Sequence, residues 1–186
     1  GQSRETHERG DRFYHLVLVA KDKKGWEQLN ELVSIAWERS YVNFVRRIPN
    51  YISDFQEVIG EDKGHLIATT ACLGGFIKQP IFDYYFTNDF SVQEKGKHNL
   101  YGFTRTMQNI LGEENFFYEL QPAMYEEQMA YNLGLVRASK ELGVPLIAAN
   151  DNHYLRERDR TVHATFLQSQ NKGDREPELF YKYTYL

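Results

Sequence analysis

The sequence predicts an α/β protein, because short apolar strands alternate with helical segments of about 10–15 residues. The segment 13–20 is apolar on both faces, a pattern typical of a strand covered on both sides in a parallel sheet or a barrel. Further strands are predicted at 65–75, 116–121 and 144–151. A closed barrel needs more strands than these, so the sequence predicts either an open sheet or a part of a larger domain.

Helical periodicity fills most of the intervals between these strands. Trp26, Leu29, Val33 and Trp37 recur at intervals of three and four and indicate an amphipathic helix. The segment 81–98 has no clean period and is expected to be irregular or partly helical. Later helices are predicted at 52–59, 100–111, 125–142 and 156–171.

Composition narrows the class of protein. The chain has 186 residues, of which 41% are hydrophobic and 26% charged, which excludes a disordered or collagen-like chain. Its net charge of −4 is not that of a domain that holds nucleic acid through its own charge. Apolar runs such as 16–20 are far shorter than the ~20 residues that span a bilayer, so no membrane association is expected. The single cysteine, Cys72, excludes an intramolecular disulfide and favours a cytoplasmic location.

The strongest local signal for chemistry follows the strand predicted at 144–151. Asp151 and His153 are two residues apart in an extended segment, so their side chains project to the same side. A carboxylate oxygen and an imidazole nitrogen are ligands that suit Zn²⁺ or Mn²⁺. Asn and Asp are also common in turns, and His153 can cap the next helix, so a purely structural turn is the alternative.

Other candidates lie near strands, at whose carboxyl ends α/β folds place their functional residues. Cys72 follows the second strand and is interpreted either as a small core residue or as a ligand. His15 in the first strand is either a ligand or a hydrogen-bonded structural residue, and Glu119 near the end of the third is either a ligand or base or a solvated charge. Phosphate-loop, nucleophile-elbow and His-Glu-x-x-His motifs are absent from the sequence. The residues alone predict an α/β domain with a candidate metal site at Asp151 and His153.

Four segments, in this order and spacing, resemble the PHP (polymerase and histidinol phosphatase) domain of the bacterial DNA polymerase III alpha subunit. The last is the most specific, because a strand, an Asn-Asp-x-His-Tyr turn and the following helix match together. The resemblance covers nearly the whole chain. The segments are YHLVLVAKDKKGWEQLNELVSIAW (14–37), GHLIATTACLGG (64–75), ENFFYELQ (114–121) and ELGVPLIAANDNHYLRERDRTVHATFLQSQNKG (141–173).

The resemblance implies part of a distorted α/β barrel of about seven strands that carries divalent metal ions, zinc or manganese. By position, the metal ligands that it implies are His15, Cys72, Asp151 and His153. Glu119 and His163 also match family positions, but they are not carried over as ligands. The chain, 1–186, is expected to be an incomplete PHP domain. The amino-terminal strands with the family's His-x-His motif and the downstream polymerase domains are expected to be absent from it.

The expected function is that of a segment of the DNA polymerase III alpha subunit. The parent protein would be a magnesium-dependent DNA-directed DNA polymerase, and its PHP domain would bind divalent metals and support 3′–5′ exonuclease activity. No catalytic or substrate-binding residue is assigned. Expected partners are DNA, through the parent polymerase, and the exonuclease and other replisome subunits. Two alternatives stay open: a non-catalytic module that docks the proofreading exonuclease, and a free-standing PHP phosphoesterase.

Overall fold

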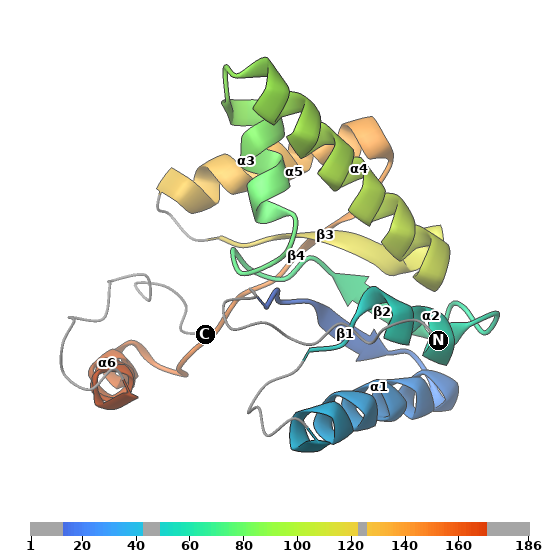
Figure 1. Ribbon diagram of the computed structural model, residues 1–186. Helices are drawn as coiled ribbons and strands as arrows, with labels where there is room; N and C mark the ends of the chain where they lie inside the picture. The colour runs from blue at the N-terminus through green and yellow to red at the C-terminus, as the bar shows by residue number, and fades with distance from the viewer. Residues whose placement is uncertain (1–12, 43–48, 123–125, 171–186) are drawn as a thin grey trace.

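A computed structural model describes residues 13–42, 49–122 and 126–170 (Figure 1). Its centre is a four-stranded sheet of β1 (Val17–Ala20), β2 (Leu66–Thr69), β3 (Phe116–Leu120) and β4 (Leu146–Ala148), in that order. β2, β3 and β4 run parallel, whereas β1 is antiparallel to β2 and pairs Val17 with Thr69. The α/β class and the four strand positions predicted from the sequence are therefore confirmed.

Helices connect the strands and cover the sheet. In Figure 1, α3, α4 and α5 pack together above the sheet, α1 lies below it beside β1, and α6 stands apart. No described helix is long and apolar enough to cross a membrane. The helices are α1 (Lys23–Val42), α2 (Ile52–Ile59), α3 (Lys78–Phe86), α4 (Phe90–Leu111), α5 (Glu126–Leu142) and α6 (Arg160–Gln170).

The segment 81–98, expected to be irregular or partly helical, is helical except at 87–89, where α3 ends and α4 begins. Asp89 caps the new helix, because its carboxylate accepts hydrogen bonds from the backbone N–H groups of Ser91 and Val92 at 2.9 and 3.2 Å. A single period fitted across this break fails, because two helices with different axes share the segment.

β1 differs from the covered parallel strand that its apolar sequence predicts. It pairs antiparallel, and only with β2 in the described sheet. Val17 and Val19 remain 43% and 50% exposed. Apolar residues on both faces are therefore not a sign of parallel pairing here. They mark a strand whose outer side is left open in the described part of the chain.

α1 lies where the sequence predicts a helix, but its buried face is rotated from the predicted apolar stripe, of which Leu29 packs against the core. Leu32 is 1% exposed, whereas Trp26 and Trp37 of the predicted apolar stripe are 58% and 70% exposed. Gly25 explains the rotation, because a Cβ at this residue would lie 2.0 Å from the carbonyl oxygen of His65. The helix therefore begins in direct contact with the backbone before β2, and the next side chain, Trp26, is turned outward.

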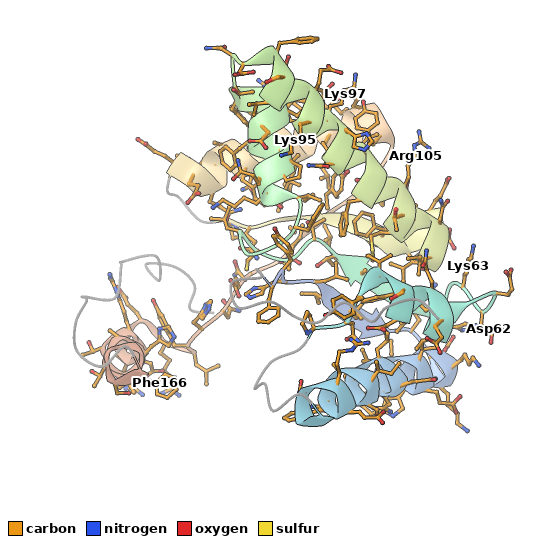
Figure 2. All side chains as sticks on the ribbon, in the orientation of Figure 1. Asp62, Lys63, Lys95, Lys97, Arg105 and Phe166 are labelled. Carbon is orange, nitrogen blue, oxygen red and sulfur yellow. The ribbon has the colours of Figure 1, made fainter. Side chains whose placement is uncertain are left out.

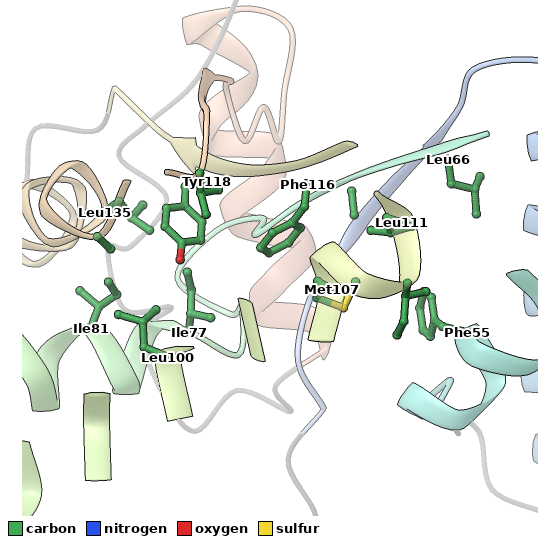
Figure 3. Close-up of a cluster of buried hydrophobic side chains, with 14 of the residues drawn as sticks. Phe55, Leu66, Ile77, Ile81, Leu100, Met107, Leu111, Phe116, Tyr118 and Leu135 are labelled. Carbon is green, nitrogen blue, oxygen red and sulfur yellow. The ribbon is translucent and has the colours of Figure 1, made fainter. Parts of the chain in front are cut away.

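The hydrophobic core packs the sheet against α3, α4 and α5 and also includes Leu32 of α1 and Phe55 and Ile59 of α2 (Figure 3). Phe116 and Tyr118 of β3 are fully buried. In Figure 3, Tyr118 lies near Leu100 of α4 and Leu135 of α5, and Phe116 lies near Met107 of α4. Burial of each such side chain stabilises the fold by about 1.5–3 kcal/mol. This packed layer fixes β3, and through it the neighbouring ends of β2 and β4.

A partly buried ion pair joins α1 to the start of α2. The Arg39 guanidinium donates to both carboxylate oxygens of Asp54 at 2.8 and 2.9 Å, and to the carbonyl oxygen of Pro49 at 2.9 Å. Asp54 also accepts from the Tyr51 backbone N–H at 2.7 Å. Burial raises the pKa of Asp54, but the hydrogen bonds from Arg39 and Tyr51 outweigh it, so this pKa lies below its ordinary value.

A tight turn leads from β2 toward α3 and carries Cys72. Ala71 has a φ of 56°, in the left-handed region that few residues other than glycine adopt. The Gly75 N–H donates to the Cys72 carbonyl oxygen at 2.9 Å, and a Cβ on Gly75 would lie 2.2 Å from the Thr70 carbonyl oxygen. The turn is also bonded to the segment just before β1, because the His15 N–H donates to the Gly74 carbonyl oxygen at 2.9 Å.

Asp54→Ala removes the carboxylate partner of this partly buried ion pair, whereas Arg39 keeps its hydrogen bond to the Pro49 carbonyl oxygen. We expect the free energy of unfolding to fall by about 1.5–3 kcal/mol, the range for a hydrogen bond to a charged group. Urea denaturation followed by circular dichroism measures this loss. The matched control is Asp62→Ala, which breaks the exposed pair with Lys24 (3.0 Å) and should cost at most about 1 kcal/mol.

The same variant also predicts a pH dependence. The pKa of Asp54 is lower in the folded chain, so its contribution is complete above the ordinary aspartate value of about 3.9 and is lost as the pH falls through the folded pKa. Acid should therefore destabilise the wild type more steeply than Asp54→Ala. Equal losses in the two Asp→Ala variants, or parallel pH profiles, would contradict this role.

Gly75→Ala should strain the turn, because its Cβ meets the Thr70 carbonyl oxygen. We expect a loss of at least about 1–3 kcal/mol of stability. Gly102→Ala is the control: nothing lies within 4 Å of its Cβ, and it is inside α4, so alanine should stabilise by about 0.5–1 kcal/mol. Thermal denaturation measures both changes. A Gly75→Ala chain as stable as the wild type would show that the turn is not constrained.

Candidate metal site

Two of the four predicted ligands are in contact at one edge of the sheet, and a third lies near them. His15 Nδ1 is 3.3 Å from Cys72 Sγ, and Asp151 is near enough to Cys72 for its negative charge to raise the pKa of that thiol. These residues lie before β1, after β2 and after β4. The parallel strands β2 and β4 bring their carboxyl ends to one edge, and the antiparallel β1 brings its amino end to that edge.

The Cys72 thiol is held in its neutral form. Burial raises the pKa of Cys72, the negative charge of Asp151 raises it further, and the Gly74 backbone N–H, 3.4 Å from Sγ, opposes the shift. A cation at this position would reverse the balance, because a coordinated thiol loses its proton.

His153 lies beside Asp151 but faces the last described helix. Its Nδ1 donates to the Asp151 carbonyl oxygen at 2.8 Å and is 4.0 Å from a carboxylate oxygen of the same residue. This bond places the proton on Nδ1 and the lone pair on Nε2, the arrangement found in histidines that bind metals. The His153 ring lies 5.4 Å from the ring of His163 on α6, centroid to centroid. Burial, and then the nearby His153, lower the pKa of His163.

The donor atoms suit a divalent ion, whereas the full ligand set is not assembled. Thiol, imidazole and carboxylate together are typical of zinc. Two ligands of a tetrahedral zinc at about 2.1 and 2.3 Å lie about 3.6 Å apart. The separation of His15 Nδ1 and Cys72 Sγ, 3.3 Å, is close to this value. Within the described residues, however, no group of three or more His, Cys, Asp or Glu side chains converges as a metal site.

Glu119 occupies a different position from the one that its place near the end of β3 suggested. It is 6% exposed, and its carboxyl accepts from the Thr69 hydroxyl and from Gln121 Nε2, the latter at 2.9 Å. Its backbone N–H donates to Thr70 Oγ1 at 3.0 Å. Sequence reasoning did not single out these two threonines. The signal that the sequence offers is the polar pair Thr69-Thr70 at the end of the apolar segment 66–68.

Similarity to known proteins shows the family of the chain. Residues 3–123 match the family model of the PHP domain. Over 177 residues the chain is 37% identical to the probable DNA polymerase YorL of Bacillus subtilis, covering 92% of this chain but 13% of that protein. Over 153 residues it is 37% identical to the DNA polymerase III subunit alpha of Borreliella burgdorferi, covering 82% of this chain and 12% of that subunit. The chain thus spans about an eighth of the length of these curated relatives, and it belongs to the PHP domain family.

Proposed function

We propose that this chain forms part of the PHP domain of a replicative DNA polymerase and contributes a divalent metal site that supports phosphodiester hydrolysis, as in 3′–5′ proofreading. The observation that carries the proposal is the contact of His15 with Cys72 at the edge of the sheet where β4 also ends, just before Asp151. The names of the relatives support the polymerase context. Magnesium-dependent DNA synthesis, DNA binding and contacts with replisome subunits belong, in this proposal, to a longer protein of the relatives' kind.

The proposal includes a sheet larger than the four described strands, a distorted barrel of about seven. Two features of the outer strands support it. Val17 and Val19 on β1 are exposed, and Leu146 and Ile147 on β4 are 38% and 40% exposed. Strands as apolar as these are normally covered. Additional strands beside β1 and β4 would cover them and would bring further ligands to the same edge.

Each proposed ligand has a distinct chemical role. Cys72 offers a soft sulfur, Asp151 a negative charge, and His15 and His153 offer imidazole nitrogens. The Asp151 carbonyl oxygen orients the ring of His153. A bound zinc or manganese would supply an activated water and stabilise the leaving oxygen of the phosphodiester. None of the four side chains acts as a nucleophile in this proposal.

Cys72→Ser and Asp151→Asn should each weaken Zn²⁺ and Mn²⁺ binding by at least about tenfold, because each removes a charged ligand. Isothermal titration calorimetry on the full chain measures the affinities, and elemental analysis after dialysis measures bound metal. Asp62→Asn, an exposed acidic residue near α2, is the control and should bind like the wild type. A wild-type chain without bound metal, or three variants with equal affinity, would refute the metal site.

A docking role is the second candidate, and the exposed face of α1 favours it. Trp26, Val33 and Trp37 are 58%, 47% and 70% exposed. Aromatic residues, tryptophan above all, are typical of the energetically important centre of protein interfaces. The outer surface of α4, in contrast, bears basic side chains such as Lys97 and Arg105 (Figure 2). The proposed partner of the α1 face is the proofreading exonuclease subunit.

The double variant Trp26→Ser, Trp37→Ser should reduce capture of the purified exonuclease subunit by at least about tenfold, because the two indole rings would be buried at the interface. Surface plasmon resonance measures the affinity. Phe90→Ser is the control, since Phe90 is 74% exposed on α4, away from this face. Equal binding by both variants would count against docking through α1.

A further inference from the structure

Glu119 is a buried carboxyl without an ion pair to a basic side chain in the described part of the chain. Placing such a group in the interior is expensive unless hydrogen bonds replace the lost water. Here they do: one carboxyl oxygen accepts from the Thr69 hydroxyl and the other from Gln121 Nε2 at 2.9 Å. The carboxyl is thus held between the ends of β2 and β3.

Thr69 connects the carboxyl of Glu119 to the turn that carries Cys72, because its hydroxyl is hydrogen-bonded to both. A hydroxyl has one proton to donate and lone pairs that accept. Since the proton of Thr69 points at Glu119, a lone pair of Oγ1 faces the Ala71 backbone N–H, which donates to it at 3.3 Å. Ala71 is the residue with the left-handed backbone. Glu119 therefore orients the hydroxyl that supports the strained position of the turn.

The direction of the turn decides where the Cys72 sulfur lies. Cys72 directly follows Ala71, and its sulfur is 3.3 Å from His15 Nδ1 and 3.4 Å from the Gly74 backbone N–H. A residue held in an unfavourable conformation persists only where its surroundings enforce it. Without the support from Thr69, the backbone at Ala71 can relax and carry the sulfur away from His15.

A second branch ties the carboxyl to α5. Gln121, which donates to Glu119, also exchanges hydrogen bonds with Asn132: its carbonyl oxygen accepts at 2.7 Å, and its N–H donates at 3.4 Å. Gln128 Nε2 donates to the same Asn132 at 2.9 Å. The carboxyl of Glu119 is thus held from a rigid helix as well as from the sheet, which suits a group that orients others.

We propose that Glu119 and Thr69 are positioning residues for the Cys72 sulfur, which they hold toward His15 through the Ala71 turn. This inference rests on the proposed metal site for its use, but it concerns the turn itself. Neither residue contacts the predicted ligands directly in the hydrogen bonds described above, so both act through the backbone.

Three variants separate positioning from simple stability. Glu119→Gln places an amide N–H against one of two donors, so one hydrogen bond is lost. Thr69→Val removes the hydroxyl at nearly constant shape, and Thr69→Ser keeps it. Glu141→Gln is the matched control, because this carboxylate accepts from the hydroxyls of Tyr84 and Tyr85 at 2.8 and 2.6 Å, far from the turn in the chain.

The first measurement needs no metal. Cys72 is the only cysteine, so iodoacetamide alkylation of the folded chain reports on its sulfur alone. We expect Glu119→Gln and Thr69→Val to change the rate by about threefold or more, with Thr69→Ser and Glu141→Gln close to the wild type. Rates that are equal in all variants, or that follow only the urea midpoint, would overturn the inference.

The second measurement uses Co²⁺ as the probe. Glu119→Gln and Thr69→Val should bind cobalt about tenfold or more weakly and lose sulfur-to-cobalt absorption, and Thr69→Ser should restore both. Wild-type affinity and absorption in Glu119→Gln and Thr69→Val would contradict positioning toward a metal. A wild-type chain that shows no sulfur-to-cobalt absorption, while alkylation still changes in these variants, would refute the proposed metal site and leave the positioning inference standing.

Discussion

The antiparallel pairing of β1 with β2 determines which candidate ligands can lie close together. In a wholly parallel sheet, the amino end of β1 would lie at the edge opposite the ends of β2 and β4. Because β1 runs the other way, His15 meets the turn after β2, at the edge of the sheet where β4 also ends. A strand register of four residue pairs, from Val17 with Thr69 to Ala20 with Leu66, therefore sets the distance between His15 and Cys72.

The packing of β3 and the hydrogen bonds of Glu119 support the edge of the sheet where the candidate ligands lie. The buried side chains of β3 fix its position against α4 and α5, and the hydrogen bonds of Glu119 tie the end of β3 to the end of β2. Above them, the turn at Ala71 is strained and is closed by Gly75 against the Thr70 carbonyl oxygen. Strain of this kind is common at functional sites, where neighbouring structure maintains it. The buried contacts around β3 and Glu119 thus maintain the strained turn at Ala71.

Much of the fold was predictable from the sequence, since apolar runs and helical periods are local signals. The four strands and the helices α1, α2 and α5 lie where these signals indicated. The orientation of β1 and the buried face of α1 were not predictable, because they depend on contacts between distant residues, such as Gly25 against the His65 carbonyl oxygen. The segment 81–98 contains the end of α3 and the start of α4, which meet at Asp89. Each helix has its own period, so no single period fits the whole segment.

The candidate site shows the same division. Asp151 and His153 are a local signal, as a pair after a strand. His15 and Cys72 are also candidates from their places near strands, and the family resemblance identifies them as ligands. Their contact, across 57 residues, is a property of the sheet. The roles of Thr69 and Thr70 are not predictable from the sequence, because nothing in a strand indicates which distant residue its threonine hydroxyls will bond.

X-ray absorption at the zinc edge tests the central claim most directly, that one edge of the sheet gathers sulfur, imidazole and carboxylate around a cation. The zinc-loaded chain should show one sulfur at about 2.3 Å together with nitrogen or oxygen ligands at about 2.0–2.2 Å. The sulfur contribution should vanish in Cys72→Ser. A spectrum with nitrogen and oxygen ligands only, unchanged in that variant, would contradict the account.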